Sequence, residues 1–247
     1  MFSYYGSKSR VIKLYPSPKF EKVIEPFAGS ARYALRFFDK DVLLVDKYPV
    51  IVKVWKYLQS ASEADILGLP FLQKGEEIPD SLSDTEKLFM GFIVADGAAS
   101  PQKKTTSFSS NPNKVEARLK TIAKQLFKIR HWKIELGSYE DLSNTEATWF
   151  IDPPYQFGGE YYKHNGLNYP ELAKWCQSRN GQVIVCENTR ADWLPFSPMK
   201  KLEGQMYKST EALWSNLPHD YQFEQQSLFT PPNTACSGRV ARAATRR

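Results

Sequence analysis

The sequence predicts an α/β protein with a doubly wound, mostly parallel sheet that is interrupted by an inserted, mainly helical region. Three observations favour this fold class. Short apolar segments alternate with helical ones near both ends of the chain, as in βαβ units. Two of the apolar segments end directly at an aspartate. The alternation stops between residues 59 and 132.

The first part of the chain contains two predicted βα units. A continuous apolar run is typical of a strand that is buried on both faces of a parallel sheet. The predicted elements are a strand over 20–25, a tight turn over 26–30, a helix over 31–38, a strand over 41–45 and a helix over 51–58.

The middle of the chain has a different pattern. A stretch over 68–79 is rich in turn residues, and it is followed by a predicted helix over 85–95 and a polar loop over 100–110. An amphipathic helix is predicted over 114–130. Its apolar stripe consists of Val115, Leu119, Ile122, Leu126 and Ile129, and its basic face of Lys120, Lys124 and Lys128 at four-residue spacing.

The sheet pattern returns after residue 132. The predicted elements are strands over 133–136 and 145–151, a helix over 169–177, a strand over 182–186 and a closing pair over 211–214 and 221–229. We therefore divide the chain into a sheet domain of residues 1–58 and 133–230, an insert of residues 59–132 and a basic, flexible tail of residues 231–247.

The positive charge of the chain is concentrated in one segment. The chain has 33 Lys and Arg against 27 Asp and Glu, which gives a net charge of +6. Residues 101–133 hold nine basic residues and a single acidic one, Glu116. One basic segment on a neutral-to-acidic body predicts contact with a polyanion at a defined place.

Composition excludes several classes of protein. With 42% apolar residues the chain is neither an acidic disordered protein nor a collagen-like repeat. The longest apolar stretch, 88–95, is far shorter than the roughly 20 residues that span a bilayer. We expect no secretory signal, because no basic flank precedes an apolar run at the start. Cys176, Cys186 and Cys236 lack metal-ligand spacing, which favours a reducing cytoplasm and no metal site.

The turn over residues 25–30 and the aspartate at position 46 predict a nucleoside site. Ligands of open α/β sheets lie beyond the carboxyl ends of strands, and Gly29 permits close approach of the backbone. Asp46 can accept hydrogen bonds from ribose hydroxyls, and it follows Glu25 by about 20 residues, as in nucleoside-binding βαβ units. A single glycine makes no phosphate cradle, so we expect a ligand without pyrophosphate. The alternative is an ordinary turn with a solvated aspartate.

The Asp-Pro-Pro-Tyr tetrapeptide at residues 152–155 is the most informative motif. Two prolines directly after a buried strand lack N–H groups and fix φ, so the chain leaves the sheet extended. Asp152 offers a carboxylate acceptor and Tyr155 an aromatic face. An exocyclic base amine needs this combination, because its lone pair is delocalised into the ring until acceptors hold both hydrogens. The alternative is a plain strand-terminating turn.

These motifs, in this order, resemble those of the DNA adenine methylase (Dam-like) family of adenine-N6 DNA methyltransferases. The resemblance covers most of residues 2–58 and 133–216, and it rests on residues 4–8, 25–30, 46 and 152–155. It implies a methyltransferase-type sheet, with the sheet domain as the catalytic domain and the insert as the target-recognition region. It also implies S-adenosylmethionine as the methyl donor and S-adenosylhomocysteine as the product.

The resemblance also implies which residues form the site. The residues that would line the donor site are Tyr4, Lys8, Glu25, Phe27, Gly29 and Asp46. Those at the target amine would be Asp152, Pro153 and Tyr155. Two positions depart from the family pattern. Ala31 replaces a further glycine, a mild change where the backbone stays helical. Gly137-Ser138-Tyr139 replaces an Asp-Phe pair that contacts the donor's adenine, and there Ser138 can still accept a hydrogen bond.

The implied reaction is methyl transfer from S-adenosylmethionine to the N6 amine of an adenine that is flipped out of DNA. Tyr155 would stack on the ring, while Asp152 and the Pro153 carbonyl would accept the two amine hydrogens. Positioning and electrostatics would supply most of the catalysis, without a metal or a covalent intermediate. Tyr161 and Tyr162 could close over the flipped base or simply pack. The rival hypotheses are methylation of RNA adenine, cytosine or a protein amide, and a non-catalytic DNA-binding module.

The basic residues of the insert are the predicted DNA contacts, since neutralised phosphates contribute salt-dependent affinity. The loop over 105–113 could reach base edges. The alternative for the lysine stripe is a solvated helix face. The residues assigned to DNA are Lys103, Lys104, Lys114, Arg118, Lys120, Lys124 and Lys128. We expect a monomer that acts on double-stranded DNA in the cytoplasm of a bacterial or phage-infected cell, in a setting such as restriction-modification.

Overall fold

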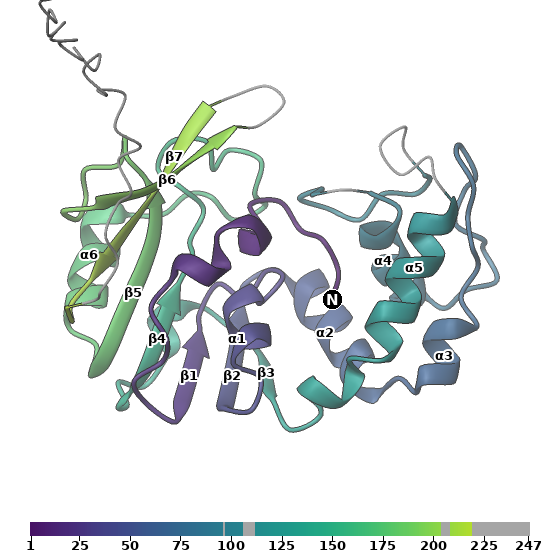
Figure 1. Cartoon of the computed structure of the whole chain (residues 1–247), viewed down its shortest axis with the longest axis horizontal. Coiled ribbons are helices and arrows are strands. Elements are labelled where there is room, and N and C mark those ends of the chain that lie inside the picture. The colour runs from purple at the N-terminus through teal and green to yellow at the C-terminus, as the bar shows by residue number, and fades with distance from the viewer. Residues whose placement is uncertain (96, 106–111, 204–207, 219–247) are drawn as a thin grey trace, which may run out of the picture.

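The protein is an open α/β sheet with a group of helices beside it (Figure 1). The computed structural model describes residues 1–95, 97–105, 112–203 and 208–218. The strands are β1 (Lys22–Glu25), β2 (Asp41–Asp46), β3 (Lys133–Leu136), β4 (Ala147–Ile151), β5 (Gly181–Asn188), β6 (Ser197–Glu203) and β7 (Lys208–Ser215). The helices are α1 (Arg32–Arg36), α2 (Pro49–Ser60), α3 (Glu63–Leu67), α4 (Asp84–Ile93), α5 (Pro112–Ala123) and α6 (Tyr169–Gln177). Short 3₁₀ turns cover Lys8–Arg10, Ile12–Leu14, Leu126–Ile129 and Tyr139–Asp141.

The described strands form one sheet in the order β3-β2-β1-β4-β5-β7-β6. The pairs from β3 across to β5 are parallel, while β7 runs antiparallel between β5 and β6. The chain proceeds outward to β2 and β3 on one side of β1, and outward to β5 on the other side of β4. The direction of the chain's progress through the sheet therefore changes between the neighbouring strands β1 and β4. Open α/β sheets bind ligands at such a switch point. The predicted fold class, a doubly wound, mostly parallel sheet with a mainly helical insert, is confirmed.

Both faces of the sheet carry a hydrophobic core. Val23 and Phe150 belong to the core that contains side chains of α1 and α2, whereas Ile24 and Trp149 belong to the core that contains side chains of α6. Successive side chains of a strand point to opposite faces, so neighbours such as Val23 and Ile24 enter different cores. This two-sided burial explains why the strands are continuous apolar runs.

Local signals start most of the helices. Pro49 lies in the first turn of α2, where its missing N–H costs nothing. Ser62 and Ser83 begin α3 and α4 with capping boxes, each closed by an acidic side chain three residues later. Helix α2 links the two halves of the protein, because it contacts β2 and β3 as well as α4. Of the helices that the structure describes, none is long and apolar enough to cross a membrane.

The predicted basic helix over 114–130 is wrong in its extent. Helix α5 ends at Ala123, and a 3₁₀ turn covers Leu126–Ile129. Residues three apart lie on one face of a 3₁₀ turn, so this conformation buries both Leu126 and Ile129. As a result Lys124 and Lys128 do not continue the face of Lys120 along one α-helix.

The closing pair of strands also differs from the prediction. The strand expected over 211–214 is part of β7, but its hairpin partner is β6, which the sequence pattern missed. Pro198 lies in β6 at the edge of the sheet, where a proline is tolerated. Residues 221–229 and the tail lie outside the described residues. The short helix α3 was also missed, although the Ser62–Asp65 capping box marks its start.

Candidate functional site

A cavity of about 410 Å³ lies at the switch point of the sheet. Its volume is within the range of roughly 300–1,000 Å³ that is typical of small-molecule and cofactor sites. Its walls come from the chain segments 4–8, 25–32, 46–48, 137–140, 150–154 and 162–168. These segments include the turns that follow β1, β2, β3 and β4, so the cavity lies at the carboxyl ends of neighbouring parallel strands.

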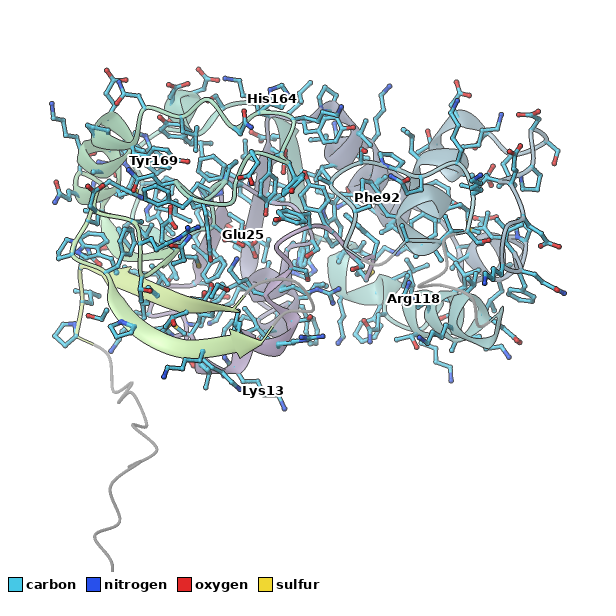
Figure 2. All side chains as sticks on the ribbon, turned by 90° about the horizontal axis from the view of Figure 1, so that it is seen from above. Lys13, Glu25, Phe92, Arg118, His164 and Tyr169 are labelled. Carbon is cyan, nitrogen blue, oxygen red and sulfur yellow. The ribbon has the colours of Figure 1, made fainter. Side chains whose placement is uncertain are left out.

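The structure brings most of the predicted site residues together in this cavity. The predicted residues that line it are Tyr4, Lys8, Glu25, Phe27, Gly29, Asp46, Ser138 and Asp152. Pro153 and Tyr155 follow Asp152 but do not line the cavity. Figure 2, seen from above, places Glu25 near the middle of the sheet half, with His164 toward its edge and Arg118 in the helical half.

Two backbone N–H groups hold the carboxylate of Asp46. The Gly29 N–H donates to Oδ2 at 2.9 Å, and the Tyr48 N–H donates to Oδ1 at 2.8 Å. Gly29 has φ +43°, and a Cβ at this position would lie 3.1 Å from Cδ1 of Tyr4. Burial raises the pKa of Asp46 to about 6, although the two N–H groups oppose the shift. Since a carboxylate has about four acceptor positions, Asp46 can still accept hydrogen bonds from a ligand.

Glu25, the last residue of β1, caps the N-terminus of the following helix, α1. Its Oε1 accepts a hydrogen bond of 2.6 Å from the Ala34 N–H, in the first turn of α1. Ala31, the residue before this helix, has no acceptor in its side chain, so Glu25 satisfies a donor that an N-cap side chain usually serves. Burial raises the pKa of Glu25 to about 8, so this side chain keeps its proton at neutral pH.

The backbone at Ala31 is not helical, contrary to the expectation for this position. Ala31 has φ +45°, in the left-handed region that glycine adopts at lower cost. An alanine in this conformation is strained, because its Cβ disfavours the left-handed region.

Lys8 forms a buried ion pair with the tetrapeptide's aspartate. Its Nζ lies 2.7 Å from Oδ1 of Asp152 and 3.8 Å from Oε1 of Glu211, and it donates to the Gly6 carbonyl at 3.1 Å. Burial by itself would lower the pKa of Lys8, but the two carboxylates raise it above its ordinary value. Burial also raises the pKa of Asp152 to about 6, and the attraction of Lys8 opposes this shift.

Tyr155 is held at both its ring and its hydroxyl. The hydroxyl donates to Oε1 of Glu211 at 2.6 Å, and Nζ of Lys8 lies 4.7 Å from the ring centroid. The hydroxyl of Tyr15 donates to the same oxygen at 2.5 Å. Sequence reasoning missed Glu211 and Tyr15. The available signal for Glu211 was an acidic residue at the start of the strand predicted over 211–214.

The aromatic residues after the tetrapeptide pack against the N-terminal segment. Tyr162 lines the cavity and donates its hydroxyl to the Tyr5 carbonyl at 3.0 Å. Gly6, with φ +71°, makes room for it, since a Cβ at this position would clash with the Tyr162 hydroxyl oxygen. Tyr161 is 61% exposed beside the ring of Tyr5.

The wall opposite the tetrapeptide contains Ser138. Its hydroxyl donates to a carboxylate oxygen of Glu140 at 2.8 Å, and the rings of Phe27 and Tyr139 lie 5.4 Å apart, centroid to centroid. Tyr48, Glu140 and His164 also line the cavity and were not predicted for the site. Among the residues that the structure describes, no group of three or more His, Cys, Asp or Glu side chains is arranged to hold a metal ion.

The basic residues of the insert differ in their surroundings. Lys103, Lys104, Lys114, Lys120 and Lys124 are exposed. Arg118 is half-buried and donates to the Ile93 carbonyl at 2.8 Å, and Nζ of Lys128 lies 4.8 Å from the ring centroid of Phe38. Lys120 forms an ion pair with Glu116 at 2.6 Å. Of the loop that was expected to reach base edges, residues 106–111 lie outside the described residues.

The chain has a distant resemblance to a solved structure. No family model matches the sequence, and no curated protein matches it. The solved structure is that of yhhF from Escherichia coli, a protein provisionally named a methyltransferase, with 10% identity and a TM-score of 0.35 over 83% of this chain and 78% of that chain. So distant a likeness carries no weight for the activity, which must be argued from the site itself.

Proposed function

We propose that this protein transfers a methyl group from S-adenosylmethionine to the N6 amine of a flipped-out adenine in a specific DNA sequence. The observation that carries the proposal is that Asp152 shares one cavity with the turn over 25–30 and with Asp46. A carboxylate suited to a base amine therefore lies beside a pocket suited to a nucleoside, at the switch point of the sheet.

The donor half of the cavity fits a nucleoside-type ligand. Asp46 has acceptor positions left for ribose hydroxyls, and Gly29 brings the backbone close to the ligand without a side chain between them. Phe27 and Tyr4 add aromatic surface to the same walls. S-adenosylmethionine, when bound, would supply an electrophilic methyl carbon. We place its adenosine against these residues.

Asp152 is suited to hold the amine. Lys8 occupies its Oδ1, while Oδ2 has no hydrogen-bond partner among the described residues. We assign Oδ2 and the Pro153 carbonyl as acceptors of the two amine hydrogens. The nitrogen would gain the methyl group as the donor's S–CH3 bond breaks, which leaves S-adenosylhomocysteine, and it would lose one proton, which passes to Asp152. A carboxyl whose pKa is raised to about 6 can accept this proton and release it to solvent near neutral pH.

We assign Tyr155 to stack on the extruded base. Lys8 lies over one face of its ring, so the base would stack on the other face. The exposed lysines of the insert would neutralise phosphates on either side of the extruded nucleotide. Flipping costs a few kcal/mol of unstacking and unpairing, which the contacts to the backbone help to offset.

The test is incubation of the purified protein with methyl-labelled donor and with DNA, RNA or protein in turn. We expect label in DNA alone, recovered as N6-methyladenine, and single-molecule sequencing of DNA from expressing cells should report one sequence context. Label found only in RNA, cytosine or protein would overturn the DNA adenine assignment. DNA binding without any affinity for the donor would instead identify a non-catalytic module.

A further inference from the structure

We infer that Glu211 is a positioning residue, which anchors Tyr155 and shares Lys8 with Asp152. This inference rests on the proposed function and extends it to a strand outside every motif of the site. Glu211 is 4% exposed and lies in β7. Its backbone is opposite Asn188 of β5 and Lys200 of β6, so strands on both sides hold it in place.

Three polar side chains contact the same carboxylate oxygen of Glu211. Oε1 accepts the hydroxyls of Tyr15 and Tyr155 at 2.5 and 2.6 Å, and Nζ of Lys8 lies 3.8 Å away. A buried carboxylate is costly unless donors or a cation satisfy it. Here two phenols and one ammonium do so, and one of these phenols belongs to the tetrapeptide.

The hydrogen bond to Glu211 fixes the direction of the Tyr155 side chain, and Lys8 lies over one face of its ring. The backbone fixes one end of this side chain, and Glu211 fixes the hydroxyl at the other end. A ring held at both ends is preorganised to stack on an extruded base, whereas a ring held at one end must be ordered when the base arrives. Glu211 also gives Lys8 a second carboxylate, so that Lys8 is not committed to Asp152 alone.

Glu211→Gln tests this role, because it keeps the size of the side chain and removes its charge. We expect the single-turnover rate of methyl transfer to fall by about tenfold to a hundredfold, the scale of a small misplacement in an active site. The dissociation constants for donor and DNA should stay within about threefold of the wild type, since Glu211 does not line the cavity and lies outside the basic insert. Glu135→Gln is the matched control. It makes the same change at an exposed side chain of another strand, β3, and should leave the rate within about threefold.

Tyr155→Phe and the double variant complete a thermodynamic cycle. Tyr155→Phe removes the same hydrogen bond from its other end, so the double variant with Glu211→Gln should be no slower than the slower single variant. An unchanged rate in Glu211→Gln, or losses that multiply in the double variant, would overturn the inference. If circular dichroism shows a smaller folded fraction in the slow variant, unfolding explains its lower rate. That result would also count against the positioning role of Glu211.

A spectroscopic readout separates this inference from the proposed function. In the full chain labelled with ¹³C-tyrosine, the Tyr155 signal is assigned by its loss in Tyr155→Phe. Glu211→Gln should shift and broaden that signal, while Glu135→Gln should leave it in place. If the wild type methylates no acceptor, the proposed function fails and this spectrum still decides the anchoring. If the wild type is active and the spectrum is unchanged in Glu211→Gln, the anchoring alone fails.

Discussion

Lys8 and Asp152 meet in the interior of the protein, with Nζ of Lys8 2.7 Å from Oδ1 of Asp152. The lysine precedes the first strand of the sheet, and the aspartate directly follows β4. The pair thus joins the N-terminal motif to the tetrapeptide across the candidate donor cavity. This contact adds to the pairing of β1 with β4 in holding the two motifs together.

Loss of the Asp152 carboxylate should abolish methyl transfer and spare DNA binding. We expect Asp152→Ala to lower the turnover rate by about a hundredfold to ten-thousandfold, the usual contribution of a positioned proton acceptor. Salt-sensitive DNA affinity should persist, because Asp152 lies outside the basic insert. Label transfer and a DNA-binding titration measure the two effects. Asp192→Ala removes an exposed aspartate that bonds Gln156, next to the tetrapeptide, and serves as the control. Turnover that survives in Asp152→Ala would refute the role of this carboxylate.

Removal of the Lys8 charge should destabilise the fold. In Lys8→Met the carboxylate of Asp152 loses a partner within the protein interior, and breaking a buried pair typically costs about 3–5 kcal/mol. Urea unfolding measures this free energy. Lys40→Met is a matched control, since Lys40 lies at the same 2.7 Å from Glu21, whose side chain is 73% exposed. The control should change the free energy of unfolding very little. An equal decrease in the free energy of unfolding of the two variants would show that the buried Lys8 pair stabilises the fold no more than the exposed Lys40 pair.

The titration of Glu25 should make stability fall as the pH rises. Its pKa is about 8 in the folded protein against an ordinary 4.5. Between these values the unfolded chain has lost the proton and the folded protein keeps it, so the stabilisation present below about pH 4.5 is lost by about pH 8. Glu25→Gln keeps an oxygen for the Ala34 N–H and removes the titration.

Urea unfolding of the wild type and of Glu25→Gln at pH 5 and pH 8 measures this effect. From pH 5 to pH 8 the free energy of unfolding should decrease less in Glu25→Gln than in the wild type. The difference between the two decreases should be at most roughly 5 kcal/mol, at about 1.4 kcal/mol per pKa unit. Titrations of Asp46 and Asp152 occur in both proteins and cancel from the difference. Parallel curves would place the folded pKa of Glu25 near its ordinary value.

The exposed lysines of the insert should determine the salt dependence of DNA binding. We expect Lys114→Gln and Lys124→Gln each to weaken binding to any sequence and to reduce the salt slope by about one unit, as for one lost phosphate contact. Fluorescence anisotropy over a salt series measures the slope. Lys174→Gln is the control, because Lys174 is exposed on α6, at the opposite end of the molecule from α5 (Figure 1). An unchanged slope in both insert variants would identify these two lysines as solvated side chains that do not contact DNA.

Local pattern was enough to predict the parallel strands of the sheet and helix α6. The bounds of β3 and α6 agree with the predicted ranges, and β1, β2, β4 and β5 lie within about two residues of them. Periodicity is a local property, and burial on both faces makes each strand a recognisable apolar run. The extent of α5 and the existence of β6 were not predictable in this way, because packing of Leu126 and pairing with β7 decide them.

The sequence by itself determined which strand-end motifs meet in the cavity, because the carboxyl ends of parallel strands meet at one edge of a sheet. Glu25, Asp46 and Asp152 could therefore be placed together from their positions at the ends of predicted strands. Only the tertiary structure decided that Lys8 pairs with Asp152 and that Glu211 anchors Tyr155. These contacts join residues that are distant in the chain, and the antiparallel insertion of β7 beside β5 brings Glu211 to the tetrapeptide.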